Sequence, residues 1–329
     1  MISNPTLELP KYKMPPIELL VDHKDEIVSM RSVIGSQRFQ EAAMVLPIVL
    51  GKTVSNDAFI FDLATMRHLL IVGASGEKTV ALNAIIASIL YTKHPSQVKL
   101  VLINPNCCEF GTYEKIERHF LAKLPDAVDS IIYDTQQAKN TIDSLCIEME
   151  VRHNLCRDAG VRNIKEYNDK FIARRLNPHW GHRYLPYIVV VIDEYAYLAQ
   201  SYGKEIDVLI ARLTRAHIVG IHLIIGTFRP SIISNVIKTN FPTRIAFRVF
   251  WEKDSRNILD ASGAEQLTGW GDLLFSSDGN LIRVQCAFID YPEIEEITGF
   301  IGKQEGYLTA YLLPEYANET DQKRKTANR

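Results

Sequence analysis

The chain has 329 residues and a mass of 37.4 kDa, which is enough for one large domain or two of ordinary size. Its 37 Lys and Arg residues against 39 Asp and Glu give a formal net charge of -2, which excludes a partnership that depends on a globally basic surface. A local basic channel stays compatible with this charge. Five cysteines without any C-x-x-C pair indicate neither a disulfide framework nor a zinc site.

Hydropathy gives no sign of a membrane span or a secretory signal. The longest apolar runs are far shorter than the ~20 residues that a bilayer-crossing helix needs. Residues 1–16 contain four prolines and lack the apolar core of a signal peptide. We therefore expect a cytoplasmic protein.

The chain divides into three parts. Residues 1–25 are expected to form an extended N-terminal segment, residues 26–316 one folded domain, and residues 317–329 a polar tail. Within the domain, short β-branched runs alternate with longer amphipathic stretches, which predicts an α/β fold with a mostly parallel sheet and flanking helices.

Six strands are predicted, and the first five are nearly unbroken runs of Leu, Ile and Val, as expected where helices cover both faces of a sheet. They lie at residues 69–73, 98–104, 130–133, 188–193, 222–226 and 243–250. Helices are predicted at residues 79–91, 136–158, 164–175, 204–217 and 254–261. Segments 272–276 and 281–288 flank Asp278-Gly279 and predict a C-terminal antiparallel hairpin on the sheet edge.

The first segment with chemical meaning runs from Leu69 to Leu90, where a buried strand enters a glycine turn followed by Lys78-Thr79. A phosphate-binding loop needs glycines that let successive amides face a polyphosphate, a lysine for the terminal phosphates and a hydroxyl for Mg²⁺. Its consensus has eight residues, whereas Gly73 to Thr79 supplies seven, and Glu77 stands where the consensus has glycine. An ordinary strand-turn-helix is the alternative.

The missing residue has an expected cost in nucleotide affinity. Removing one residue turns the amides that follow out of register, so that several charge-assisted hydrogen bonds to phosphate are lost together. At roughly 1.5–3 kcal/mol for each bond, the loss of two weakens binding at least ~100-fold. We therefore predict weak or absent ATP binding.

The second segment runs from Tyr187 to Leu198, an apolar strand that ends in Asp193-Glu194. In a nucleoside triphosphatase the first carboxylate holds the Mg²⁺ shell and the second orients or deprotonates the attacking water. Capping of the next helix is the alternative. The position of the pair, over a hundred residues after the glycine turn, favours the catalytic interpretation.

With these motifs the chain resembles the motor domain of the FtsK/SpoIIIE family of DNA translocases. The resemblance covers about Glu26 to Tyr316 and rests on many separated segments. They include Gly160-Val161-Arg162-Asn163, Pro186 to Glu194, Phe241 to Phe247, Asp254-Ser255-Arg256 and Gly271 to Phe275. It implies a RecA-like P-loop NTPase motor domain, and ATP-dependent translocation along double-stranded DNA by a hexameric ring with nucleotide sites at subunit interfaces.

The resemblance also implies roles for individual residues. Thr79 and Asp193 would ligate Mg²⁺, and Glu194, Thr227 and Arg256 would be catalytic. The residues expected to bind ATP are Gly73, Ala74, Ser75, Gly76, Glu77, Lys78, Thr79 and Val80.

Other readings stay open. Phe228 replaces a glutamine of the family, and Arg256 suits a surface salt bridge equally well. A non-hydrolysing homologue acting as a DNA-binding or structural subunit is therefore the alternative, and an eroded gene product a third. Because most of the domain that precedes the family's motor is missing, we expect a monomer or a weak, DNA-dependent oligomer in isolation.

Two groups of basic or histidine residues can be explained without a role in function. Lys238, Arg244 and Arg248 could face DNA phosphates inside a ring, but salt bridges at the sheet edge are equally compatible. His179 and His182 suit a solvated loop better than a metal site, because no third ligand is near in the sequence.

Overall fold

The structure is a computed structural model that describes residues 5–23, 27–105 and 108–316. The predicted polar tail and the ends of the N-terminal segment lie outside the described residues. In the described part, no helix combines the length and the hydropathy that a membrane span requires.

A ten-stranded sheet runs through the described part of the chain, in the order β2-β1-β11-β10-β9-β3-β8-β7-β4-β6. The strands from β9 to β6 are parallel to one another, whereas β10, β11, β1 and β2 are joined by antiparallel pairings. The bounds are β1 (Pro47–Thr53), β2 (Ala58–Asp62), β3 (Leu69–Val72), β4 (Val98–Ile103), β6 (Ile131–Ile132), β7 (Tyr187–Ile192), β8 (Ile221–Thr227), β9 (Thr243–Phe247), β10 (Asp272–Ser277) and β11 (Asn280–Cys286). A separate parallel pair joins β5 (Ala122–Lys123) to β12 (Tyr311–Leu312).

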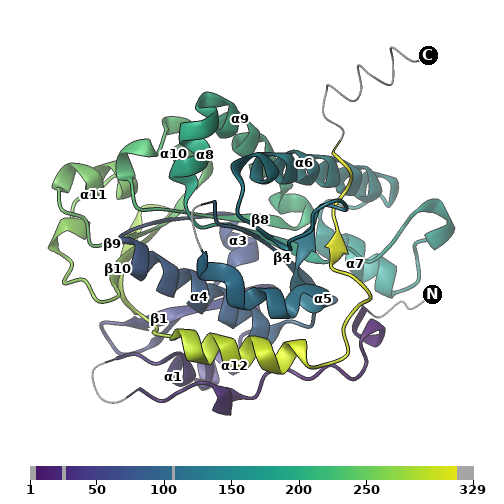
Figure 1. Cartoon of the computed structure of the whole chain (residues 1–329), viewed down its shortest axis with the longest axis horizontal. Helices are drawn as coiled ribbons and strands as arrows, with labels where there is room; N and C mark the ends of the chain where they lie inside the picture. Colours follow the sequence, from purple (N-terminus) through teal and green to yellow (C-terminus); the bar gives the residue numbers. More distant parts are fainter. Residues whose placement is uncertain (1–4, 24–26, 106–107, 317–329) are drawn as a thin grey trace.

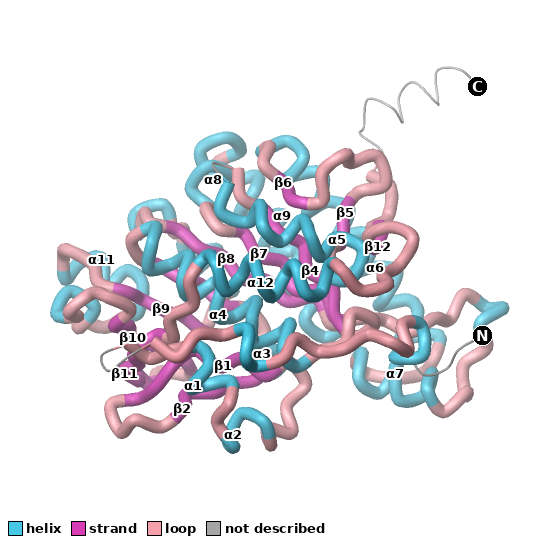
Figure 2. The backbone as a smooth tube through the Cα atoms, turned by 60° about the horizontal axis from the view of Figure 1, so that its bottom comes forward, coloured by secondary structure: helices cyan, strands magenta, loops and turns pink. Residues whose placement is uncertain are grey.

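Helices cover both faces of the large sheet (Figure 1). On one face lie α6, α8, α9 and α10, and on the other lie α4 and α12, which come in front of the strands in Figure 2. The longer helices are α4 (Ser75–Thr92), α6 (Thr135–Asp158), α7 (Ile164–Ile172), α8 (Tyr195–Tyr202), α9 (Lys204–Leu213), α11 (Glu252–Leu259) and α12 (Tyr291–Gly302). The shorter ones are α1 (Met30–Ile34), α2 (Gln37–Gln40), α3 (Leu63–Met66), α5 (Glu117–Phe120) and α10 (Asn235–Asn240), with a 3₁₀ stretch η3 (Cys108–Ile116) after β4.

Strand β3 shows why its run of apolar residues is uninterrupted. Leu69 and Ile71 pack into the core on the α4 side, whereas Leu70 and Val72 pack into the core on the α6 side. All four side chains are fully buried. Alternate side chains of a strand point to opposite faces, so a strand with helices on both sides needs an apolar residue at every position.

The predicted hairpin exists, but its placement on the sheet edge was wrong. Strand β11 pairs with β1, which in turn pairs with β2, so β10 and β11 lie inside the sheet. Strand β1 has five buried residues at its start and β2 has Phe61 packed against Phe275 of β10. These two N-terminal strands cover the edge that the hairpin would otherwise expose.

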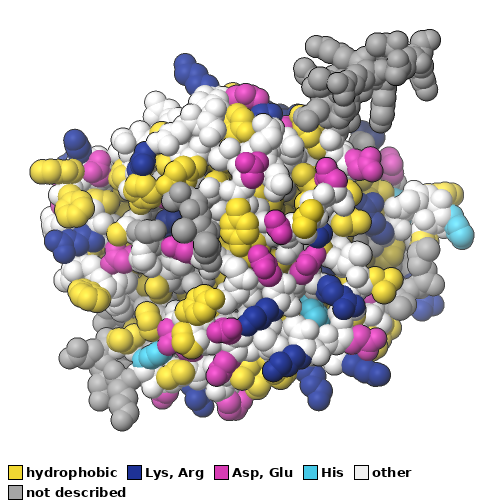
Figure 3. Space-filling view, in the orientation of Figure 1, with side chains coloured by type: hydrophobic (Ala, Val, Ile, Leu, Met, Phe, Trp, Pro, Cys, Tyr) yellow, Lys and Arg dark blue, Asp and Glu magenta, His cyan; other side chains and the backbone are white. Residues whose placement is uncertain are grey.

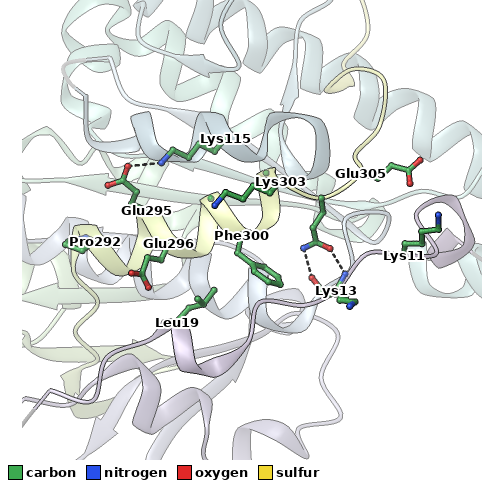
Figure 4. A pocket seen from close by; sticks show the side chains of 13 residues that line it. Lys11, Lys13, Leu19, Lys115, Pro292, Glu295, Glu296, Phe300, Lys303 and Glu305 are labelled. Carbon is green, nitrogen blue, oxygen red and sulfur yellow. Dashed lines mark hydrogen bonds and ion pairs between the residues drawn. The ribbon is translucent and has the colours of Figure 1, made fainter.

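The described part of the N-terminal segment packs along the domain. Gln304 holds the main chain of Lys13 by two hydrogen bonds of 2.7 and 2.9 Å, and Tyr91 donates to the carbonyl of Pro16. Between this segment and α12 runs a surface groove of about 1230 Å³, which Phe300 and Leu19 line together with the Lys115–Glu295 ion pair (Figure 4). No residue that the sequence predicts for the site lines this groove.

The surface carries both signs of charge in close mixture. On the face that Figure 3 shows, Lys and Arg side chains are interspersed with Asp and Glu rather than gathered in one basic patch. This face therefore fits the near-neutral composition.

Two buried histidines stabilise the amino ends of β3 and β8 in their neutral form. His68 accepts from the amide of Leu223 at 3.0 Å and donates to the carbonyl of Thr214 at 2.7 Å. His222 donates from Nδ1 to the carbonyl of Arg67 at 2.8 Å. Burial lowers the pKa of His68 to about 3 and that of His222 to about 4.

Acid should therefore destabilise the fold before most carboxylates titrate. The unfolded chain binds protons on these histidines near pH 6.5, whereas the folded chain does not, so stability is lost as the pH falls from 6.5 toward 4. At pH 5 each histidine should cost on the order of 2 kcal/mol. Urea unfolding at pH 7.5 and pH 5 measures the loss. His222→Asn should reduce this pH dependence and His179→Gln, at an exposed position, should leave it unchanged; equal stability at both pH values would contradict the assignment.

Candidate functional site

The predicted site residues gather where three neighbouring parallel strands end. Strand β8 lies between β3 and β7, so the turn after β3, Thr227 of β8 and Asp193-Glu194 after β7 meet at one edge of the sheet. Ligands of open α/β sheets bind at the carboxyl ends of the strands. The order of the strands thus brings together motifs more than a hundred residues apart.

Lys78 is at the centre of this group. Its side chain is 1% exposed, and its amine donates to the main-chain carbonyl of Asp193 at 2.5 Å and to the Asp193 carboxylate. The Glu194 carboxylate lies 3.6 Å away from the same amine. In this conformation the lysine is paired with the acidic residues and buried.

Gly226, which sequence reasoning did not single out, makes room for that lysine. A Cβ at this position would lie 2.6 Å from the Asp193 carbonyl oxygen and 2.9 Å from Cδ of Lys78. A glycine one residue before Thr227 is the only sequence signal for this contact.

Glu194 is held by three donors. The Thr227 hydroxyl donates to it at 2.7 Å, the amide of Phe228 at 3.1 Å and the amide of Ala196 at 3.2 Å. The bond to Ala196 makes Glu194 the N-cap of α8, so the capping alternative also applies. Burial raises the pKa of Glu194, against the opposing effect of Lys78, which suits a group that accepts a proton.

The turn between β3 and α4 is shorter than a phosphate loop. Only Gly73 and Ala74 separate the strand from the helix, which begins at Ser75 rather than at the predicted residue 79. Residues 75–80 therefore form helical backbone, and the amides of the first helical turn are available to an anion. Gly76 lies in open space, Val80 is half-buried, and Glu77 accepts from the amide of Gly271 at 3.3 Å.

Thr79 contacts a residue that sequence reasoning missed. Its hydroxyl donates to the carboxylate of Glu109 at 2.5 Å, and Glu109 lies in η3 just after β4. The signal available was weak, because a single glutamate five residues beyond a strand has many structural explanations.

Arg256 lies apart from this group. It is 61% exposed on α11 and pairs with Glu252, four residues earlier, at 2.6 Å. This is the surface salt bridge that the sequence left open. Lys238 and Arg244 both pair with Asp260, at 2.5 and 2.7 Å, which favours the salt-bridge interpretation for them as well.

The remaining candidates have structural explanations. His182 is buried and bonds to the hydroxyl of Tyr167 at 3.0 Å, whereas His179 is exposed. The buried cysteines Cys146, Cys156 and Cys286 are free thiols, and burial raises the pKa of each.

The residue types at the three strand ends fit Mg²⁺ and a nucleoside triphosphate. Thr79 and Asp193 supply the oxygen ligands that Mg²⁺ prefers, Lys78 a cation and the start of α4 a set of amides. The conformation is closed, because Lys78 is paired with Asp193. Lys78 can contact a phosphate only after its ion pair with Asp193 is broken.

A sequence profile of the FtsK/SpoIIIE family matches residues 29–232, which include Lys78, Asp193, Glu194 and Thr227. The chain belongs to the FtsK/SpoIIIE family. The resemblance inferred from the motifs is thereby confirmed. Arg256 lies beyond the matched residues.

Relatives at the sequence level carry the name DNA translocase FtsK. The protein from Chlorobaculum tepidum is 46% identical over 299 residues, which are 89% of this chain and 36% of the relative. The protein from Helicobacter pylori strain 26695 is 38% identical over 300 residues, 89% of this chain and 33% of the relative. The chain thus spans about a third of the length of these FtsK proteins.

Solved structures confirm the predicted fold class. The conjugation coupling protein TcpA of pCW3 is 25% identical with a TM-score of 0.64, over 84% of this chain and 75% of TcpA. The secretion ATPase EccC of Thermomonospora curvata matches 88% of this chain and 36% of its own with a TM-score of 0.67 and 19% identity. The latter likeness concerns the fold alone, that of a P-loop ATPase motor domain.

Gly226→Ala should disturb the packing of Lys78 against Asp193. Because the new methyl group would overlap a backbone oxygen, we expect a loss of about 1–3 kcal/mol in the free energy of unfolding. Gly76→Ala is the matched control in the same site: its Cβ would meet nothing within 4 Å, and a helical alanine should leave stability equal or raise it by about 0.4–1 kcal/mol. Denaturant unfolding compares the two variants, and equal stability of both would contradict the close contact.

Proposed function

We propose that this chain is the motor part of a ring-forming, ATP-driven translocase that moves along double-stranded DNA. The observation that carries the proposal is the meeting of Lys78, Asp193, Glu194 and Thr227 at the adjacent ends of β3, β7 and β8. Membership of the FtsK/SpoIIIE family supports DNA as the substrate, since relatives at 46% and 38% identity are named DNA translocases.

Each residue then has a chemical role. Glu194, with its raised pKa, orients and deprotonates the attacking water, and the Thr227 hydroxyl fixes the position of that carboxylate. Thr79 and Asp193 would hold Mg²⁺, which would supply charge neutralisation at the phosphates. The first helical turn of α4 offers its amides to the phosphates, and Lys78 reaches them after leaving Asp193.

Arg256 requires a neighbouring subunit to take part. Its guanidinium stands on an exposed face of α11 and pairs with Glu252 rather than with the other catalytic residues. In a homo-oligomeric ring this face can meet the nucleotide site of the next subunit, as the family resemblance implies. We expect the ring to form weakly in isolation and to be favoured by DNA.

Glu194→Gln should abolish ATP turnover without unfolding the protein. The amide cannot accept a proton but can still accept from Thr227, so kcat should fall by about 10²–10⁴-fold. Phosphate release by the purified chain with Mg²⁺-ATP, with and without duplex DNA, measures the effect. Glu150→Gln, which changes an exposed glutamate paired with Arg212, is the control and should keep the DNA-stimulated rate. Equal rates for Glu194→Gln and the unaltered chain, or a chain without turnover, would contradict the proposal.

A non-hydrolysing DNA-binding or structural subunit is the second candidate. Two observations favour it: the two-residue turn before α4 and the pairing of the buried Lys78 with Asp193. Under this alternative the chain binds duplex DNA but shows no turnover at any ATP concentration, so the same assay separates the two.

A further inference from the structure

A third carboxylate stands beside the residues assigned to Mg²⁺. Glu109 accepts the hydroxyl proton of Thr79 at 2.5 Å, across 30 positions of sequence. We propose that Glu109 is a positioning residue of the magnesium site, which orients the Thr79 hydroxyl toward the cation. This inference rests on the proposed function of the site.

The position of Glu109 is fixed by the packing of the 3₁₀ stretch η3 that carries it. The residue after it, Phe110, is fully buried, and Tyr113 in the same 3₁₀ stretch is 1% exposed. The Tyr113 hydroxyl donates to Asn83 of α4 at 3.0 Å, one helical turn beyond Thr79. The stretch η3 is therefore fixed against the helix that carries Thr79, and it also packs against α12.

The direction of the hydrogen bond determines what the hydroxyl can do. A threonine hydroxyl has one proton and two acceptor lone pairs, and an ionised carboxylate can only accept. With its proton directed at Glu109, the Thr79 oxygen presents lone pairs away from that carboxylate. A hydroxyl oriented in this way is ready to ligate a hard cation, and outer-shell partners of this kind commonly fix the ligands of metal sites.

Charge supports the same assignment. Asp193 is paired with Lys78, so its negative charge is compensated in the closed conformation. Within the described residues, no Lys, Arg or His lies within ion-pair distance of Glu109, which is half-buried. Its carboxylate thus adds uncompensated negative charge next to Thr79, where a divalent cation gains from it.

The test separates metal binding from nucleotide binding. A fluorescent N-methylanthraniloyl ATP is titrated into the full chain in EDTA and then at rising Mg²⁺ concentrations. Glu109→Gln should raise the Mg²⁺ concentration for half-maximal enhancement of binding at least tenfold, while binding in EDTA stays the same. Thr79→Val should have the same effect, and the double variant should be no worse than Thr79→Val alone.

Glu114→Gln is the matched control. Glu114 lies on the same 3₁₀ stretch, is exposed, and accepts from Tyr133 at 3.3 Å rather than from α4. It should leave the Mg²⁺ dependence unchanged, and thermal unfolding verifies that all variants fold.

The outcomes distinguish this inference from the function on which it rests. If the unaltered chain binds the nucleotide with Mg²⁺ enhancement and Glu109→Gln keeps that enhancement, the role of Glu109 is overturned and the proposed function stands. If the unaltered chain binds no nucleotide with or without Mg²⁺, the proposed function fails and this inference fails with it. Additive losses in the double variant would overturn the coupling of Glu109 to Thr79.

Discussion

The buried contact between Lys78 and Asp193 is the interaction on which the rest of the site depends. It joins the first turn of α4 to the end of β7 across the intervening strand β8, and it passes over Gly226. A buried ammonium group is costly unless it is paired and hydrogen-bonded, and here a carbonyl and a carboxylate of one residue satisfy it. The contact therefore fixes the start of α4 against the end of β7, and it engages the lysine and the aspartate that would serve a nucleotide.

The proposed activity requires the site to have two states: the closed conformation described above and an open one in which Lys78 contacts the nucleotide. In the closed conformation Lys78 is paired with Asp193, Glu77 accepts from Gly271 and Thr79 donates to Glu109. The side chains of Lys78 and Thr79, which would serve a nucleotide and its metal, are thus already engaged by carboxylates. A nucleotide can shift this arrangement only by as much as it prefers the open state. Opening the site costs free energy, because Lys78 must leave Asp193. This cost and the short turn after β3 both agree with the weak nucleotide affinity that the missing loop residue predicts.

Local patterns in the sequence were sufficient for the strand-helix alternation and for the main motifs. The uninterrupted apolar residues of β3 and β7 follow from burial on both faces, and the position of Asp193-Glu194 follows from the end of such a strand. Sequence reasoning missed the two N-terminal strands β1 and β2, the early start of α4, Gly226 and Glu109. These depend on contacts between segments far apart in the chain. The hairpin is covered by residues more than two hundred positions earlier, and Glu109 matters only because Tyr113 of η3 bonds to Asn83 of α4.

A double-mutant cycle on Lys78 and Asp193 tests the central contact most directly. Lys78→Met and Asp193→Leu each leave a buried polar partner uncompensated, so each should lower the free energy of unfolding by about 3–5 kcal/mol. The double variant removes both charges, and its loss should be smaller than the sum of the two by at least about 2 kcal/mol. Denaturant unfolding of the four proteins gives this coupling energy. Losses that add to within about 0.5 kcal/mol would contradict a direct buried pair and with it the closed site described above.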